Sequence, residues 1–116
     1  APGVHANGSL TLGENIADHG GLQVSYHAFK KAMETAPLEV VDGFTPEQRF
    51  FLAYANVWAG NIRPEEILRL TKLDPHSLGK WRVDGALPHI QNWYEAFNIT
   101  EQDSMFVPKE KRVSIW

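Results

Sequence analysis

Residues 12–21 read Leu-Gly-Glu-Asn-Ile-Ala-Asp-His-Gly-Gly and set two carboxylates, Glu14 and Asp18, four positions apart. In a helix this spacing puts both side chains on one face. Two interpretations are open. Thr11 and Glu14 match a capping box at a helix N-terminus, where both acids would also favour the helix dipole. The alternative is a pair of metal-site carboxylates, and from spacing alone the cap is favoured.

The sequence around this stretch predicts a long first helix. Residues 1–10 carry turn formers without periodicity and predict a loop, so the helix is expected from Thr11 to about Thr35. Gly20-Gly21 would interrupt it at a cost of roughly 1 kcal/mol per glycine, which suggests the close approach of another backbone. The later half has an apolar stripe at helical spacing, formed by Leu22, Tyr26, Phe29 and Met33.

A second helix has a strong start signal. Thr45 is a predicted N-cap, Pro46 occupies the first helical position, and Gln48 completes a capping box. Residues 50–58 are apolar on nearly every face, which is typical of a buried helix. Gly60 is expected to end it.

The remaining residues add shorter elements. A short helix is predicted over about 64–73, an irregular stretch over 74–85, and another helix over about 88–97. The inward side of that last helix is expected to comprise Ile90, Trp93, Tyr94 and Phe97. The tail ends on Val113 and Trp116, which are expected to dock. With no repeat and no second domain, the predicted fold class is mainly α.

Composition limits the function classes. The 116 residues include four Trp, six Phe and three Tyr, enough large side chains for a core. The net charge of −3 and the lack of a long basic run argue against a nucleic-acid partner. The absence of Cys excludes disulfides and thiolate metal sites, and no apolar run approaches the ~20 residues of a membrane span. The start at Ala1, without Met, suggests a cut inside a longer protein.

The full string of residues 12–21 closely resembles the glutamate-bearing motif of the neprilysin and endothelin-converting-enzyme family of zinc metallopeptidases. The resemblance implies that Glu14 is a zinc ligand and that Asp18 orients a zinc-binding His. In that family a separate H-E-x-x-H helix supplies two His ligands and the general base. These 116 residues contain no H-E-x-x-H, their five His standing at positions 5, 19, 27, 76 and 89.

A second segment carries the same resemblance. Taken alone, Asp74-Pro-His-Ser-Leu-Gly-Lys-Trp-Arg82 would be a solvated loop. It is similar to the family segment D-x-H-S-x-G-x-x-R, which implies that His76 donates a hydrogen bond to the oxyanion of the tetrahedral intermediate. Arg82 would bind a substrate backbone carbonyl, for which a guanidinium supplies several donors in a fixed fork.

A third segment, residues 50–60, resembles the family segment whose Val-Trp pair lines the pocket for the residue after the scissile bond. Val57 and Trp58 are therefore candidate substrate-binding residues, although a core helix alone would explain the composition. Animal members carry Cys where this chain has Ala59, Ile99 and Val113. That departure favours a bacterial member.

The resemblance implies that residues 1–116 form the C-terminal helical part of a thermolysin-like (gluzincin) catalytic domain. Zinc would be the cofactor, with two of its three protein ligands absent from this chain. The expected substrates are peptides with a hydrophobic residue after the scissile bond, and the isolated chain is expected to be inactive. Its partner would be the missing N-terminal part of the same protein, and exposed apolar surface would also allow self-association. The alternative is a non-catalytic peptide-binding or structural domain, and the cell envelope, the medium and the cytoplasm all stay open as locations.

Overall fold

The computed structural model describes residues 5–115, and the chain is helical over this range. The helices are α1 (Gly8–Thr35), α2 (Pro46–Val57), α3 (Pro64–Leu73), α4 (Gly79–Asp84) and α5 (Gln91–Phe97), with short 3-10 turns η1 (Leu87–His89) and η2 (Lys109–Lys111). The described residues contain no β-strand, only an isolated bridge between Val41 and Phe44. The predicted mainly α fold class is confirmed.

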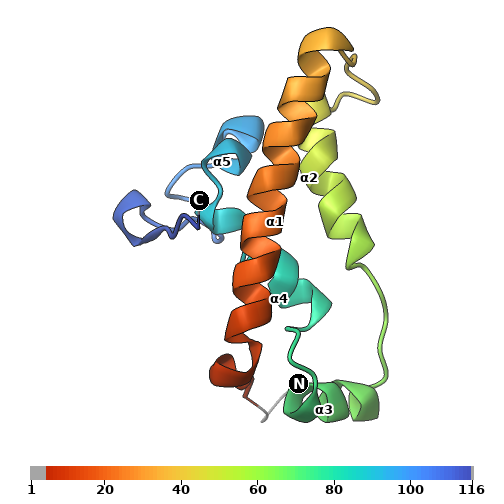
Figure 1. Cartoon of the computed structure of the whole chain (residues 1–116), viewed down its shortest axis with the longest axis vertical. Helices are drawn as coiled ribbons and strands as arrows, with labels where there is room; N and C mark the ends of the chain where they lie inside the picture. The colour runs from red at the N-terminus through yellow and green to blue at the C-terminus, as the bar shows by residue number, and fades with distance from the viewer. Residues whose placement is uncertain (1–4, 116) are drawn as a thin grey trace.

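Helix α1 sets the long dimension of the molecule (Figure 1). Its 28 residues span about 42 Å at 1.5 Å per residue, close to the longest extent of 46 Å. The helix begins at Gly8 because Asn7 is its N-cap and accepts a hydrogen bond from the backbone N–H of Leu10 at 3.2 Å. The predicted loop over residues 1–10 is therefore too long. The capping box that the sequence allowed at Thr11 and Glu14 is wrong, since both residues lie inside the helix.

Gly20 and Gly21 do not interrupt α1, which runs continuously through them. Gly20 is buried. A Cβ at Gly21 would have nothing within 4 Å, so the close approach that the sequence suggested does not occur there within this chain. Two glycines weaken a helix without breaking it when the flanking turns are packed.

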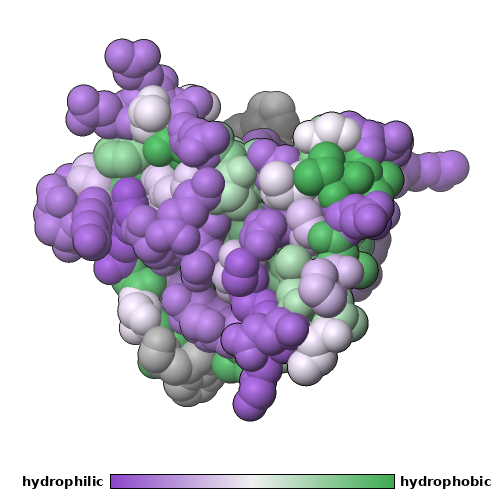
Figure 2. Space-filling model, turned by 90° about the horizontal axis from the view of Figure 1, so that it is seen from above, coloured by the Kyte–Doolittle hydropathy of each residue, from purple (hydrophilic) through white to green (hydrophobic). Residues whose placement is uncertain are grey.

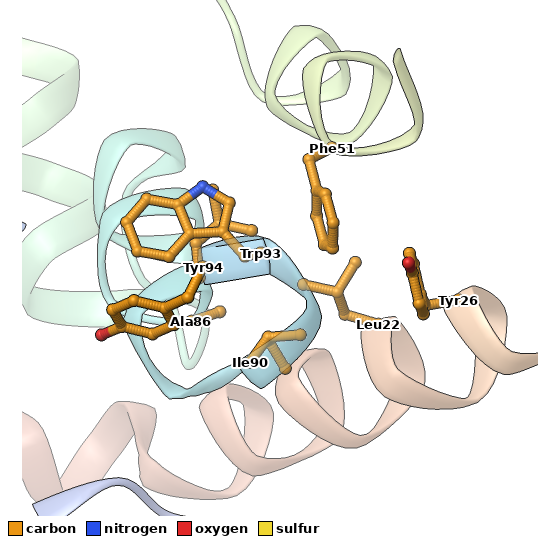
Figure 3. Packing of buried hydrophobic residues seen from close by; sticks show 8 residues of the cluster. Leu22, Tyr26, Phe51, Ala86, Ile90, Trp93 and Tyr94 are labelled. Atoms are coloured by element: carbon orange, nitrogen blue, oxygen red, sulfur yellow. The ribbon is translucent and has the colours of Figure 1, made fainter. Parts of the chain in front are cut away.

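The core lies where α1, α2 and α5 meet (Figure 3). Phe51 of α2 points toward Leu22 and Tyr26 of α1, and its ring stacks on Tyr26 with 5.2 Å between centroids. From the other side the core is completed by Ala86, Leu87, Ile90, Trp93 and Tyr94. The inward positions predicted for the last helix are thus confirmed for Ile90, Trp93 and Tyr94, while Phe97 packs against the core only partly buried.

Helix α2 starts as predicted but is not buried as predicted. Thr45 and Gln48 form the capping box, with hydrogen bonds of 3.0 and 3.2 Å. Within α2 only Pro46 and Phe51 are buried, and Val57 is 67% exposed. The reason is that α2 packs on α1 and α5 along one side only, so its other apolar face has no cover in this chain.

The second half of the chain departs from prediction in two places. The short helix α3 is confirmed, but residues 74–85 are not irregular throughout, since α4 occupies Gly79–Asp84. A Cβ at Gly79 would lie 2.5 Å from the carbonyl oxygen of Trp58. This glycine therefore permits a close approach of α4 to the end of α2. The helix predicted over 88–97 is divided into η1 and α5.

The C-terminal tail is attached through polar groups and through Met105 and Phe106, which pack against the core. Arg112 stacks on Tyr94 at 3.6 Å and donates to the carbonyl of Val107 at 2.8 Å. The Val113 side chain is 52% exposed, so its predicted docking is wrong for the side chain. Trp116 lies outside the described residues.

The surface mixes polar and apolar groups. Figure 2, which looks down on the end carrying the α1–α2 connection, shows apolar patches among mostly hydrophilic residues. That connection includes the exposed side chains of Leu38, Val40, Val41 and Phe44. Among the helices of residues 5–115, none combines the length and apolar character needed to cross a membrane.

Candidate active site

Three residues of α1 contact the segment 74–82. The hydrogen bonds between them join residues that are 62 or 64 positions apart in the sequence. Glu14 contacts His76, Asn15 accepts a 2.6 Å hydrogen bond from Ser77, and Asp18 pairs with Arg82. Because residues 14 and 18 are one turn apart, they share a face of α1. The fold therefore brings together four residues that the sequence singled out, Glu14, Asp18, His76 and Arg82.

His76 lies between two carboxylates. Asp74 Oδ1 accepts from the backbone N–H of His76 and contacts its Nδ1, both at 2.9 Å. Nε2 lies 3.2 Å from Oε2 of Glu14. The hydrogen bonds from the backbone and the ring of His76 lower the pKa of Asp74, which keeps it a carboxylate. The contact of Nδ1 with Asp74 sets the ring orientation and leaves Nε2 facing Glu14.

Arg82 forms the best-defined ion pair of the site. Its Nε and Nη2 donate to Oδ2 and Oδ1 of Asp18, each at 2.7 Å, and the side chains are only 14% and 18% exposed. This hydrogen bonding raises the pKa of Arg82 above its usual value. The guanidinium carbon lies 3.5 Å from the centre of the Trp58 ring. A bidentate pair of this kind leaves Nη1 able to donate to another acceptor.

A groove of about 420 Å³ runs between α1 and α2. Its lining includes Asp18, Ser25, Phe50, Tyr54 and Val57. Val57 is thus an exposed apolar wall beside the Asp18–Arg82 pair. Trp58 does not line this groove, because its ring lies against Arg82 instead.

Within residues 5–115, no group of three or more His, Asp or Glu side chains is arranged to hold a metal ion. Glu14 suits the part of a single ligand. Its carboxylate is 45% exposed, and its partner is the side chain of His76 rather than a backbone N–H of its own first turn. An exposed carboxylate of this kind can accept a cation from outside the chain.

Three contributors to this geometry were not predicted from the sequence: Asp74, Tyr54 and the Asn15–Ser77 contact. Asp74 could have been found, because an Asp two residues before a His commonly bonds the backbone N–H at that position. Tyr54 donates to the backbone carbonyl of Arg82 at 3.0 Å. No local pattern indicates that bond, since it joins residues 28 apart.

A second cavity, of about 450 Å³, is lined by Asn15, Asp18, Ser77 and Arg82 of the same site and extends to the C-terminal tail. The rings of His19 and His89 face it, with 5.7 Å between their centroids. His19 is 7% exposed, and its Nε2 has no hydrogen-bond partner among residues 5–115. His89 Nδ1 accepts from the backbone N–H of Val113 at 3.0 Å. Protonating His89 would remove that acceptor.

These two histidines predict a loss of stability in mild acid. Burial, and next the nearby His89, lower the pKa of His19 below 6.5, while burial and the charge of Arg112 lower the pKa of His89. The unfolded chain therefore takes up protons first as the pH falls. The contribution of the neutral pair is complete above about pH 6.5 and is lost as the pH falls through the folded-state pKa values. We expect the urea midpoint of the chain to drop between about pH 7.5 and pH 5.5.

In the double variant His19→Asn/His89→Asn, the urea midpoint should change less with pH over this range. The matched control is His27→Asn, since His27 is exposed and its loss should leave the slope unchanged. Equal slopes in the wild type and the double variant would contradict the prediction.

Known proteins match both the sequence and the fold of this chain. The chain matches peptidase family M13 over residues 1–113. Human neprilysin is 40% identical over 120 aligned residues, covering all of this chain, and a Locusta migratoria endothelin-converting enzyme homolog is 42% identical over 96 residues, or 80% of the chain. The Mycobacterium tuberculosis zinc metalloprotease Zmp1 in its open state superposes with a TM-score of 0.93 at 38% identity, over 99% of this chain.

The helical fold is that of part of a gluzincin catalytic domain. The chain belongs to peptidase family M13, the neprilysin and endothelin-converting-enzyme family, which confirms the resemblance drawn from the sequence. The chain spans 16% of human neprilysin, 13% of the Locusta protein and 18% of the Zmp1 chain. Its relatives include animal and bacterial proteins alike, so its own source stays a prediction.

Proposed function

We propose that residues 1–116 form the C-terminal segment of the catalytic domain of a zinc-dependent endopeptidase, and that this segment alone is inactive. The observation that carries the proposal is the convergence on one face of α1 of the Glu14–His76 contact at 3.2 Å and the Asp18–Arg82 pair at 2.7 Å. A structural helix cap would have bonded Glu14 within its own first turn. Asn7 fills that place instead.

Each residue has a distinct task in this proposal. Glu14 would be one protein ligand of zinc, and Asp18 would accept from a zinc-binding His outside this chain through carboxylate lone pairs that Arg82 leaves open. Zinc, when bound, supplies Lewis-acid activation of the scissile carbonyl and of water. The His ligands and the general base would come from the rest of the protein.

His76 would act on the developing oxyanion. The 2.9 Å contact of Nδ1 with Asp74 holds the ring. Donation to the substrate oxygen would require a proton on Nε2 as well, since a neutral ring donates from one nitrogen only. In the isolated chain Nε2 instead lies beside Glu14. That carboxylate would be occupied by the metal in the assembled enzyme.

Arg82 and Val57 would bind the peptide. Nη1 of Arg82 can donate to a substrate backbone carbonyl while Asp18 holds the other side of the guanidinium. Val57, 67% exposed beside the groove, would contact a hydrophobic residue after the scissile bond, with Trp58 behind it. The apolar wall and the few polar groups fit a peptide side chain.

The exposed apolar face of the chain supports a partner within the same protein. Leu12, Val24, Leu52 and Val57 are 42–67% exposed along α1 and α2. The chain spans about a sixth of neprilysin. We infer that the rest of the catalytic domain covers this face, and that the isolated chain would self-associate through it.

Zinc titration with a peptide-cleavage assay tests the proposal. The full-length protein should bind zinc stoichiometrically and cleave peptides, while the 116-residue chain should do neither. Tight stoichiometric zinc binding or turnover by the chain alone would sink the claim that it is incomplete. A full-length protein without zinc-dependent cleavage would sink the proposed activity.

A further inference from the structure

Arg82 is held from three sides, and α2 supplies two of them. Asp18 of α1 holds one edge of the guanidinium through two hydrogen bonds of 2.7 Å. Trp58 covers a face of the same group at 3.5 Å. Tyr54, one turn earlier on α2, donates to the backbone carbonyl of Arg82 at 3.0 Å. Residues i and i+4 share a helix face, so Tyr54 and Trp58 reach Arg82 together.

The Trp58 stack adds a constraint that the ion pair lacks. Two hydrogen bonds to a carboxylate set the edge that Arg82 presents, but they leave the pair able to tilt as a unit. An aromatic ring against the guanidinium face opposes that tilt. The direction of Nη1, which makes no bond to Asp18, is therefore set by Asp18 and Trp58 jointly. The contact with Arg82 is made by the face of the Trp58 ring.

The Tyr54 bond constrains the backbone. Helix α4 has six residues, and a short helix leaves carbonyl groups at its end without intrahelical partners. The Tyr54 hydroxyl donates to one of them. Burial, and then the charge of Asp18, raise the pKa of Tyr54, so the hydroxyl keeps its proton at neutral pH. The close approach of Gly79 to the carbonyl of Trp58 holds the other end of α4 against α2.

We propose that Tyr54 and Trp58 are positioning residues for substrate binding, Trp58 by fixing the plane of the Arg82 guanidinium and Tyr54 by fixing its backbone. The proposal rests on the proposed role of Arg82 in binding a substrate carbonyl. It divides the Val-Trp pair: Val57 faces the substrate groove, and Trp58 acts through Arg82.

Steady-state kinetics of the full-length peptidase provide the first test. Trp58→Leu and Tyr54→Phe should each raise KM for a peptide substrate by about three- to tenfold, with a smaller change in kcat, because a misdirected Nη1 weakens substrate binding. Trp58→Phe keeps an aromatic face and should recover most of the loss. In an Arg82→Ala background, adding either α2 change should alter KM by less than about twofold, since the group they position is gone.

Tyr94→Phe is the matched control. Its hydroxyl also donates to a backbone carbonyl, that of Pro88 at 2.6 Å, but it lies in the core. Removing it should lower stability and leave KM unchanged. Equal KM increases with and without Arg82 would overturn the proposal, because the α2 residues would then act only on the fold.

A second measurement on the 116-residue chain separates this inference from the proposed activity. Solvent exchange of the Arg82 Nε–H, followed by NMR, should speed up in Trp58→Leu and stay slow in Tyr94→Phe. Unchanged exchange in Trp58→Leu would overturn the positioning role even if the full-length protein cleaves peptides. A wild-type protein without peptidase activity would count against the proposed function alone, and the exchange result would still decide whether α2 holds Arg82.

Discussion

Replacing Phe51 with Ala is expected to cost the chain roughly 3–5 kcal/mol of unfolding free energy. Phe51 is 2% exposed and joins α2 to the rest of the core through its stacked contact with Tyr26. Phe50 packs edge-on against the Phe51 ring, with 5.3 Å between centroids. Truncation would leave a cavity that three helices line, and backbone relaxation could fill it only in part. The free energy of unfolding of a small domain is about 5–15 kcal/mol in all, so this loss is a large share of it.

The adjacent residue provides the control. Leu52 belongs to the same turn of α2 but is 42% exposed, and Ala is the better helix former. Leu52→Ala should therefore cost well under about 1 kcal/mol. Urea unfolding of both variants, followed by circular dichroism, measures the difference. Similar losses for the two would mean that α2 is not packed through Phe51.

The start of a helix was predicted correctly where its N-cap residue was unambiguous in the sequence. At α2, Thr45, Pro46 and Gln48 form a local signal that needs no tertiary contact, and the helix starts where that signal predicts. At α1 the true cap is Asn7, inside an Asn-Gly-Ser stretch that also suits a turn. Asn serves both structures through the same side-chain acceptor. Sequence alone therefore left the choice to the packing of the residues that follow.

The burial predicted for α2 does not occur within this chain. The apolar residues of α2 on every face indicate a helix covered on every side, and α2 is covered on one. The pattern fits the proposal that the rest of a catalytic domain covers the other faces of α2. An exposed Val57 is thus consistent with the pattern and with the share of neprilysin that the chain spans.

The candidate site residues were predicted by motif, and their contacts with one another were not. Nothing in the sequence pairs Asp18 with Arg82, which stand 64 residues apart, or directs Tyr54 at the α4 backbone. Those contacts depend on the angle at which α4 packs across α1, and that angle is set by Gly79 against Trp58 and by the core. Long-range geometry of this kind follows from packing, which local patterns do not encode.

If the proposed function holds, Glu14→Gln and His76→Ala in the full-length protein should impair cleavage in two distinguishable ways. A neutral amide is a poor zinc ligand, so Glu14→Gln should weaken zinc binding by more than about 100-fold, beyond the usual effect of changing an outer residue. His76→Ala should keep its zinc and lose about 10²–10³ in kcat, the usual cost of removing one oxyanion donor. Zinc content by atomic absorption and kcat on a peptide substrate measure the two effects.

The contact between these residues makes the separation informative. Nε2 of His76 lies 3.2 Å from Glu14 in the chain, so either residue could in principle influence the other's role. If His76→Ala also lost zinc, His76 would belong with the ligand set and its role as oxyanion donor would fall. Near-wild-type kinetics in His76→Ala would remove that role as well. Lys80→Ala is the control in the same segment, because Lys80 is exposed and pairs only with Asp84 among the described residues; it should change neither zinc content nor kcat. Two opposite signatures from side chains in contact would place the metal on the Glu14 side and the reacting carbonyl on the His76 side.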